Sequence, residues 1–298
     1  MSTIPPRAVF VIRETEYEHL LARHATREQA RFFLKTRGQS LEEVEARHRH
    51  FCSALKTAHA AVPADWRQAT VGRADLDRFH FAPEDVVVAV GQDGLVANTA
   101  KYLSGQPVVG VNPDPALFDG VLARLAPGSL ARLLPAVAQQ DCALERLTMA
   151  EARRDDGERL LALNEVFIGH RSHQSARYEI VYGEKREAQS SSGLIVASGT
   201  GATGWARSIS ETTGIRFSLG REEPALEFFV REPFPSVSTG TTIRAGRLVA
   251  GHPLAVISRQ YEDGTIFADG IEQDRLEFDW GRRVEIGVAD ETLNLVTP

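Results

Sequence analysis

Apolar residues recur at helical spacing in two places near the start of the chain. In residues 17–35 they return every three or four positions, which predicts one helix over that range. A second helix is expected from Leu41 until Pro63, because Ser40 and Glu43 just before and inside it have the spacing of a capping box. Each helix presents one apolar face to a core.

Short apolar runs rich in β-branched residues lie around these helices. Residues 9–12, 85–90 and 107–112 are apolar on both faces, which is typical of parallel strands covered by helices. Residues 95–103 can form a helix between the last two runs. This alternation predicts an N-terminal α/β domain with an open parallel sheet over residues 1–125.

After Pro135 the pattern changes to short β-rich segments. They are separated by turns such as Asp156–Gly157, and one helix is expected after Gly204. The chain of 298 residues is long enough for two domains of moderate size. We therefore predict a second, β-rich domain over residues 126–270.

Composition excludes several classes of protein. The 34 basic and 40 acidic side chains give a net charge of −6, which argues against a general nucleic-acid binder. The two cysteines, Cys52 and Cys142, provide neither a disulfide framework nor a zinc motif, so we expect a reducing compartment, the cytoplasm. The apolar runs are strand-sized, and we expect no signal peptide, membrane helix or membrane partner.

The turn Gly91-Gln92-Asp93-Gly94 follows a predicted parallel strand at the edge where open α/β sheets bind ligands. It places one carboxylate between glycines, where backbone N–H groups can approach a phosphate. An acid at this point could orient or deprotonate a hydroxyl, or hold Mg²⁺. The alternative is a plain strand-to-helix turn that uses glycine and aspartate for their backbone tolerance.

A glycine-rich segment, residues 198–205, joins the predicted strand 194–197 to a helix. Gly199, Gly201 and Gly204 spell GxGxxG, so a dinucleotide loop of an oxidoreductase is one interpretation. The segment lies in the β-rich half, however, and no second parallel α/β half follows it. Its hydroxyl residues suit hydrogen bonding to a nucleotide at least as well.

Asn164 and Glu165 lie side by side within the apolar run 160–168, which reads as one strand. Neighbouring side chains in a strand face opposite sides, so at most one of the two would be buried without a partner. This pair suggests hydrogen bonding to a polyol such as ribose. A strand end or a turn is the alternative.

Taken together and in order, these segments resemble the NAD kinase family over nearly the whole chain. Residues 91–94 are similar to the family's GGDG motif, Asn164–Glu165 to its NE motif, and residues 200–205 to its TGSTAY-type segment. Three further stretches resemble the branch that includes mitochondrial-type NAD kinases: residues 191–194, 230–236 and 267–272.

The resemblance implies an NAD kinase-like fold whose last segment, residues 271–298, returns to the first domain, with the active site between the domains. It implies a homo-oligomer, a dimer or larger, and transfer of the γ-phosphoryl group of ATP, with Mg²⁺, to the 2′-hydroxyl of the adenosine ribose of NAD(H). Asp93 would be catalytic, within a phosphate-donor loop that includes Gly91, Gln92 and Gly94. The residues implied to bind substrate are Asn164, Glu165, Thr200, Gly201, Thr203, Gly204, Trp205 and Asp269.

Gln92 departs from the family pattern, in which this position is glycine. Its side chain stands where the backbone approaches phosphate, and we expect its backbone to adopt a strained conformation that glycine tolerates better. Three alternatives therefore stay open. They are a kinase of the same fold for another nucleoside or polyol, an inactive NAD(P)-binding protein, and an NAD-linked oxidoreductase.

Overall fold

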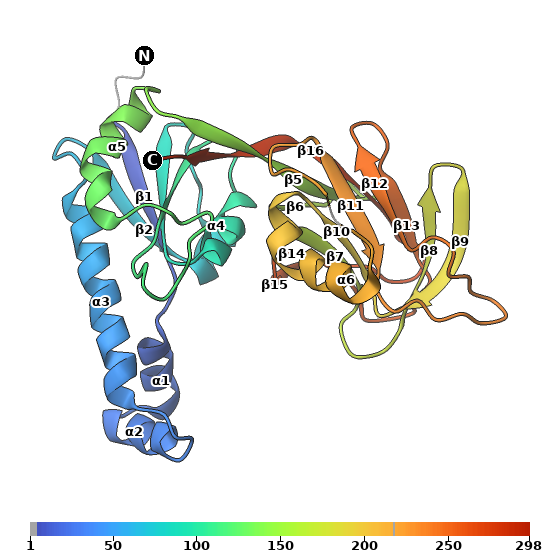
Figure 1. Cartoon of the computed structure of the whole chain (residues 1–298), viewed down its shortest axis with the longest axis horizontal. Helices are drawn as coiled ribbons and strands as arrows, with labels where there is room; N and C mark the ends of the chain where they lie inside the picture. The colour runs from blue at the N-terminus through green and yellow to red at the C-terminus, as the bar shows by residue number, and fades with distance from the viewer. Residues whose placement is uncertain (1–4, 217) are drawn as a thin grey trace. The chain divides into compact units, whose positions relative to one another are not determined.

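The structure is a computed structural model that describes residues 5–216 and 218–298. The chain divides into two compact units. The first contains the described residues up to Thr99, together with Gln106–Leu144 and Leu295–Pro298, and the second contains Ala100–Gly105 and Glu145–Asn294. Figure 1 labels the elements of both units.

The first unit is built on four parallel strands in the order β2-β1-β3-β4. Strand β3 is buried along its whole length, as expected of a β-branched run covered on both faces. The elements of this unit are β1 (Arg7–Ile12), α1 (Glu16–His24), α2 (Arg27–Lys35), α3 (Leu41–Ala60), β2 (Arg67–Gly72), η1 (Arg73–Arg78), β3 (Asp85–Val90), α4 (Asp93–Ala100), β4 (Pro107–Val111), η2 (Pro127–Ser129) and α5 (Leu130–Ala138).

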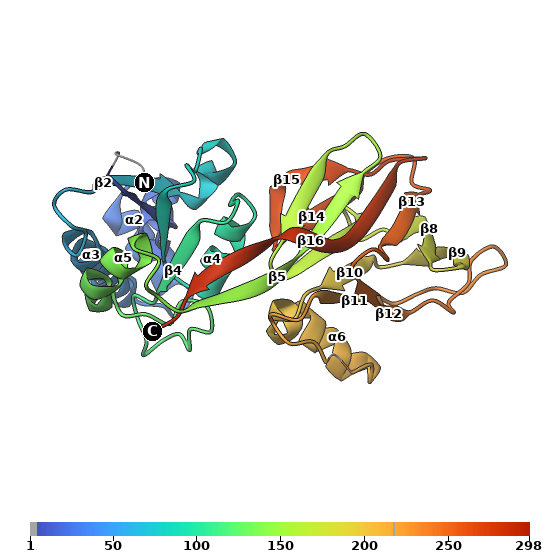
Figure 2. The same ribbon diagram turned by 90° about the horizontal axis from the view of Figure 1, so that it is seen from above.

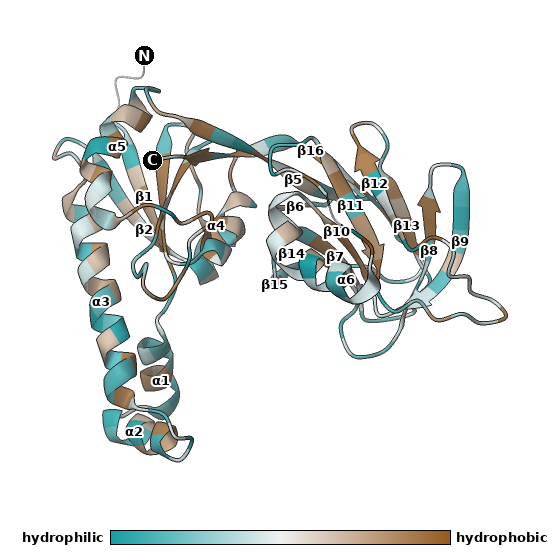
Figure 3. Ribbon diagram, in the orientation of Figure 1, coloured by the Kyte–Doolittle hydropathy of each residue, from teal (hydrophilic) through white to brown (hydrophobic). Residues whose placement is uncertain are grey.

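Helices cover both faces of this sheet. Helices α3 and α5 lie on one side of the strands and α4 on the other (Figure 1). Apolar residues of α3, α5 and alternate strand positions form one buried cluster, which Val296 near the C-terminus joins. Figure 3 shows hydrophilic and hydrophobic residues interspersed along α3, as expected of a helix with one face on a core.

The single helix expected over residues 17–35 is two helices in the structure, so the prediction of one continuous helix is wrong. Helix α1 ends at His24, and the next residue, Ala25, has a positive φ of 60°. Thr26 caps α2 by accepting from the Gln29 N–H. Thr15 and Glu18 form a capping box at the start of α1. The helix expected after Ser40 is present as α3, and the Ser40 side chain accepts from the Glu43 N–H.

The second unit is β-rich and antiparallel. One of its sheets has the order β12-β11-β10-β7-β14-β15, and the other contains β13, β8 and β9 with most of β16, β5 and β6. Its elements are β5 (Leu144–Arg154), β6 (Arg159–Ala162), β7 (Glu165–His170), β8 (Ala176–Tyr182), β9 (Lys185–Ser191), β10 (Leu194–Ala197), η3 (Thr200–Thr203), α6 (Trp205–Thr213), β11 (Ala225–Val230), β12 (Ala245–Val249), β13 (Leu254–Ser258), β14 (Gly264–Ala268), β15 (Ile271–Glu277) and β16 (Arg283–Val296).

The two sheets of this unit enclose a large apolar cluster to which both contribute alternate residues. Helix α6 lies on the outer face of the β10–β11 sheet, away from β5 and β16 (Figure 2). There it covers a second cluster that includes Phe167, Ile195 and Phe229. The predicted N-terminal α/β region and β-rich C-terminal region are both confirmed.

Candidate functional site

The turn after β3 leads directly into α4, which begins at Asp93. The Gly91 N–H donates to the Val111 carbonyl at 2.9 Å, and the Leu95 N–H donates to the Gln92 carbonyl at 2.9 Å. The N–H groups in the first turn of a helix lack intrahelical acceptors, so the exposed face of this turn can receive an anion. Gln92 and Gly94 are both exposed on it.

Asp93 holds the loop that follows β4. Its carboxylate accepts from the backbone N–H groups of Val121, Leu122 and Ala123, each at 2.8 Å. A carboxylate offers about four lone-pair directions, so one on Oδ2 remains. The residue expected to be catalytic therefore has a structural task within its own unit and one acceptor position to spare.

The expected strain at Gln92 is wrong. Among the described residues the non-glycine positions with positive φ are Ala25, Gln140, Glu232, Asp263 and Asp269. Gly91 and Gly94 also lack positive φ, and a Cβ at Gly94 would meet nothing within 4 Å. The turn therefore demands no glycine for its backbone angles, and Gln92 occupies it without a conformational penalty.

In the second unit, Asp269 organises the Asn164–Glu165 pair. Its carboxylate accepts from the N–H groups of Leu163 at 2.8 Å, Asn164 at 2.8 Å and Glu165 at 3.1 Å. Its own N–H donates to the Glu165 carbonyl at 3.1 Å, and its φ is 51°. Hydrogen bonds to a charged acceptor contribute about 1.5–3 kcal/mol each, so this clip fixes the backbone firmly.

The clip explains why the strand expected over residues 160–168 is interrupted, which corrects that prediction. Strand β6 ends at Ala162 and β7 begins at Glu165, because the N–H groups of Leu163, Asn164 and Glu165 bond to the Asp269 carboxylate instead of a neighbouring strand. The Asn164 carbonyl then accepts from the Ser198 N–H at 2.9 Å. Asn164 thus lies at a bend, as the turn interpretation expects.

The acidic side chains at this bend are poorly solvated. Burial, reinforced by the nearby Asp269 carboxylate, raises the pKa of Glu165 to about 8. Burial likewise raises the pKa of Asp269 to about 6, against the opposing effect of its backbone donors and of Lys101. Glu165 is therefore protonated at neutral pH and can both donate and accept a hydrogen bond.

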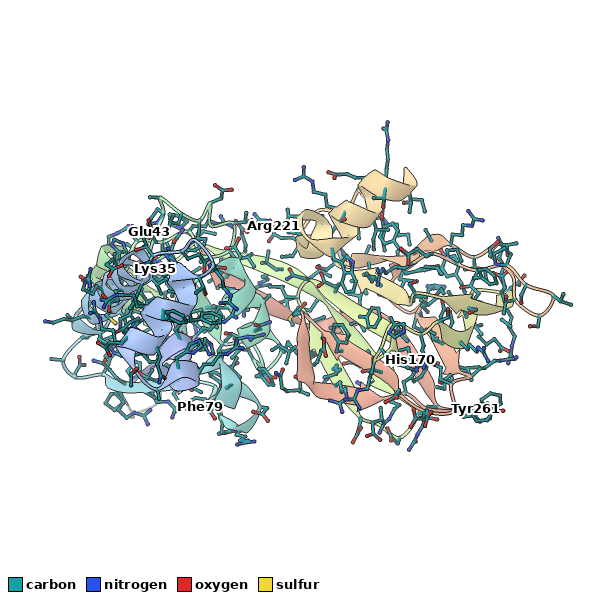
Figure 4. All side chains as sticks on the ribbon, turned by 90° about the horizontal axis from the view of Figure 1, so that it is seen from below. Lys35, Glu43, Phe79, His170, Arg221 and Tyr261 are labelled. Carbon is teal, nitrogen blue, oxygen red and sulfur yellow. The ribbon has the colours of Figure 1, made fainter. Side chains whose placement is uncertain are left out.

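The glycine-rich segment packs tightly against the bend. A Cβ at Gly201 would overlap the Asn164 carbonyl, and one at Gly199 would overlap the Gly220 carbonyl beside Arg221, which Figure 4 labels near the start of α6. The Ser198 hydroxyl donates to the Leu163 carbonyl and accepts from the Thr200 N–H at 3.1 Å. These glycines are required by close backbone approach within the protein.

Three polar groups at the bend lack partners. The Thr200 hydroxyl is buried, with 5% of the residue exposed, and has no hydrogen-bond partner. Among the described residues, the side chains of Asn164 and Glu165 also form no hydrogen bond. Thr200 is buried, and Asn164 and Glu165 are half-buried. Since buried polar groups are normally paired, this cluster is suited to a polar ligand.

Aromatic side chains continue the same face of the sheet. Trp205 stacks on Phe167, with ring centroids 5.6 Å apart and an interplanar angle of 14°. Phe167 contacts Phe267 at 4.8 Å, and Arg231 lies over the other ring, Trp205, at 4.9 Å. Glu165 and Phe167 are two residues apart in β7 and so face the same side. Neither Phe167 nor Arg231, which lies in the family-like stretch 230–236, was expected to have a role in the site.

Lys101 is a third residue that sequence reasoning missed. Its side chain is 1% exposed, and its ammonium group donates to the Ala268 carbonyl at 3.3 Å and lies 2.7 Å from an Asp274 carboxylate oxygen. It thereby fixes the residue next to Asp269. No local pattern marks such a lysine, because its partners lie far along the chain.

The structure thus brings Asn164, Glu165, Thr200, Gly201 and Asp269 together within the second unit. Thr203, Gly204 and Trp205 follow them directly, and the Thr203 hydroxyl contacts the Thr200 carbonyl at 3.4 Å. Gly91, Gln92, Asp93 and Gly94 form their own turn in the first unit.

The described residues contain neither a metal-binding cluster nor a membrane-spanning helix. Within residues 5–216 and 218–298, no group of three or more histidine, cysteine, aspartate or glutamate side chains is placed to hold a metal ion. In the same residues, no helix has the length and apolar character needed to span a membrane.

In sequence, the chain matches no family model and no curated protein. In structure, it is similar to an NAD kinase from Archaeoglobus fulgidus in complex with ATP, with a TM-score of 0.58 and 19% identity over 98% of this chain and 93% of that chain. It is also similar to yeast NADH kinase complexed with NADH, with a TM-score of 0.59 and 14% identity over 99% of this chain and 84% of that chain. At this level of identity the similarity concerns architecture, and the chain has the fold of NAD kinases.

Proposed function

We propose that the protein is a phosphotransferase that moves the γ-phosphoryl group of ATP to the 2′-hydroxyl of the adenosine ribose of NAD(H). The observation that carries the proposal is the set of unpaired polar groups on Asn164, Glu165 and Thr200, held in place by Asp269 and its three N–H donors. The two structural neighbours were solved with ATP and with NADH, which supports an adenosine ligand.

The acceptor residues have complementary chemistry for a ribose. The Asn164 amide can donate and accept, and the protonated Glu165 carboxyl can do the same, so together they match vicinal hydroxyls. The Thr200 hydroxyl, Thr203 and Trp205 would lie toward the adenine. Asp269 acts as a positioning residue in this scheme, because its carboxylate is already bonded to backbone.

Asp93 has the charge that phosphoryl transfer requires. Its remaining lone pair can accept the proton of the attacking hydroxyl, and its negative charge favours Mg²⁺ nearby. Mg²⁺ is commonly held by one or two carboxylates together with the nucleotide phosphates, so Asp93 would supply a carboxylate to an ion that arrives with ATP. When bound, this ion neutralises phosphate charge.

An inactive NAD(P)-binding protein is the second candidate, and one observation favours it. Three of the lone pairs on Asp93 are engaged by the 121–123 loop, so the residue has a sufficient structural reason to be present. A kinase of the same fold for another nucleoside or polyol is the third. An oxidoreductase is disfavoured, because β10 is antiparallel to both of its neighbours, and Gly199 and Gly201 of the segment after it pack against protein backbone.

One assay separates these functions. Purified protein with ATP and Mg²⁺ is offered NAD, NADH and a panel of free nucleosides, and products are separated by chromatography. We expect formation of NADP or NADPH. Phosphorylation of a compound other than NAD(H) would show that the acceptor is that compound. Tight NAD(H) binding without any product would favour the inactive NAD(P)-binding protein.

The role of Asp93 is tested with two matched variants. Asp93→Asn keeps the shape but removes the charge, and we expect kcat to fall by about 10²–10⁴-fold with little change in NAD affinity. Asn112→Ala is the control, because the Asn112 side chain holds the same loop through Asp114 N–H and the Phe118 carbonyl without carrying charge. Equal losses in both variants would reduce Asp93 to a support for the loop.

Binding by the acceptor residues is tested separately. Asn164→Ala should weaken NAD binding by about 1–3 kcal/mol, the usual value of a buried polar contact, with the fold retained by circular dichroism. Unchanged calorimetric affinity would remove this residue from the site. The homo-oligomeric state and the cytoplasmic location stay predictions. Sedimentation velocity tests the oligomeric state.

A further inference from the structure

Arg231, which follows β11, lies against the first residue of α6. Its guanidinium carbon is 4.9 Å from the centroid of the Trp205 ring, and its Nη1 donates to the Ser192 carbonyl at 3.3 Å. Among the residues that the structure describes, no carboxylate forms an ion pair with it. An arginine that is oriented by an aromatic face and a carbonyl, but not neutralised, is prepared to bind an anion.

The start of α6, whose first residue is Trp205, offers further donors. Gly204 provides no side-chain cap, and no acidic residue lies in the first turn of this nine-residue helix. The first N–H groups of a helix lack intrahelical acceptors and carry the positive end of the helix dipole. The preceding short turn η3 contains Thr200, whose buried hydroxyl has no partner.

These donors come from three segments, and among the described residues no acidic side chain is bonded to them. Hydrogen bonds can be donated by the Nη groups of Arg231, by the first N–H groups of α6 and by the Thr200 hydroxyl. A phosphate group is the common ligand that accepts from such a set. Stacking of Trp205 on Phe167 at 5.6 Å fixes the surface on which the guanidinium rests, so little ordering is needed on binding.

We propose that Arg231 and the start of α6 bind a phosphate group of the acceptor, which makes the acceptor a phosphorylated adenosine compound such as a dinucleotide and not a free nucleoside or polyol. This inference deepens the proposed function, and it rests on that function for the identity of the acceptor. Arg231 is then a specificity-determining residue of the acceptor site.

The test compares ligands with and without phosphate. Calorimetry measures binding of NAD, ATP, adenosine and inorganic pyrophosphate to the full-length parent and to Arg231→Gln. The matched control is Arg207→Gln, since Arg207 lies on α6 but is 68% exposed and paired with Glu211 at 2.8 Å. We expect Arg231→Gln to weaken NAD about 10- to 100-fold, as for loss of a charge-assisted hydrogen bond, and to leave adenosine within about twofold.

The outcomes are decisive in both directions. Equal weakening of NAD and adenosine would mean that Arg231 only supports the Trp205 ring, and unchanged NAD affinity would mean that it binds no phosphate of the acceptor. Weakening of ATP alone would assign the anion to the phosphate donor. A parent that binds neither NAD nor pyrophosphate also overturns the inference.

The kinase assay is read independently. If the parent phosphorylates NAD and Arg231→Gln binds NAD normally, the proposed function stands and the phosphate site is refuted. If the parent has no kinase activity but its NAD binding depends on Arg231, the proposed function is refuted and the phosphate site stands. The charge-conserving Arg231→Lys should recover part of the NAD affinity, which a purely steric role would not predict.

Discussion

Replacing Glu165 with glutamine should change how the stability of the second unit depends on pH. Burial and the Asp269 carboxylate raise the pKa of Glu165 to about 8 from an ordinary value of 4.5. Between these two values the folded chain binds more protons than the unfolded chain, so stability falls as pH rises through that window. The stabilising contribution is fully present below about pH 4.5 and is lost above about pH 8.

The size of the effect follows from the same values. One pH unit of difference in pKa corresponds to about 1.36 kcal/mol, so ionising Glu165 costs the folded state up to about 4–5 kcal/mol above pH 8. Asp269, with its pKa raised to about 6, titrates together with Glu165. Glu165→Gln removes one charge of this pair. Between pH 5 and pH 9 we therefore expect the free energy of unfolding of the variant to fall by about 3–5 kcal/mol less than that of the parent.

Urea denaturation at a series of pH values and constant ionic strength measures this difference. Tryptophan fluorescence reports on the second unit through Trp205 and Trp280, and on the first unit through Trp66. Glu184→Gln, an exposed glutamate of the same unit, is the control and should follow the parent. If Glu165→Gln and the parent lose stability in parallel from pH 5 to pH 9, the carboxyl is not desolvated and the reasoning fails.

Three further predictions concern the same contacts. Gly201→Ala should destabilise the protein by about 1–3 kcal/mol, because the new methyl overlaps the Asn164 carbonyl, whereas Gly128→Ala, with open space around it, should melt within experimental error of the parent. Asp269→Ala leaves three N–H donors unpaired and should lower the free energy of unfolding by about 3 kcal/mol or more, and an unchanged urea midpoint would contradict the clip. Gln92→Gly should give equal or higher ATP-dependent activity because it opens the turn to phosphate, and a collapse in kcat would assign Gln92 a positive role.

Features set by neighbouring residues were predictable from the sequence. Ser40 caps the start of α3 because its hydroxyl accepts from the N–H of Glu43, three residues further on, and the β-branched run before Gly91 forms a buried parallel strand. The break between α1 and α2 carried a local signal too. Thr26 is a good N-cap residue, and attention to it would have divided the helix expected over residues 17–35.

Features set by distant residues were not predictable in this way. Asp269 interrupts the strand at Leu163 although the two residues are 106 positions apart. Lys101 and Asp274 form a buried pair across 173 positions. The Asn164–Glu165 pair was found because its polarity conflicts with an apolar run, but its conformation depends on a carboxylate that only the tertiary fold brings near.

The attachment of Asp93 to the 121–123 loop bears on how its presence is interpreted in evolution. A lineage that lost phosphoryl transfer would still be selected to keep this aspartate, because its loss leaves three backbone donors without an acceptor. Gln92 has no such tie and is free to drift once donor binding is relaxed. The presence of aspartate in this turn is therefore weak evidence for an active enzyme. The residue at position 92 responds more directly to whether donor binding is still under selection.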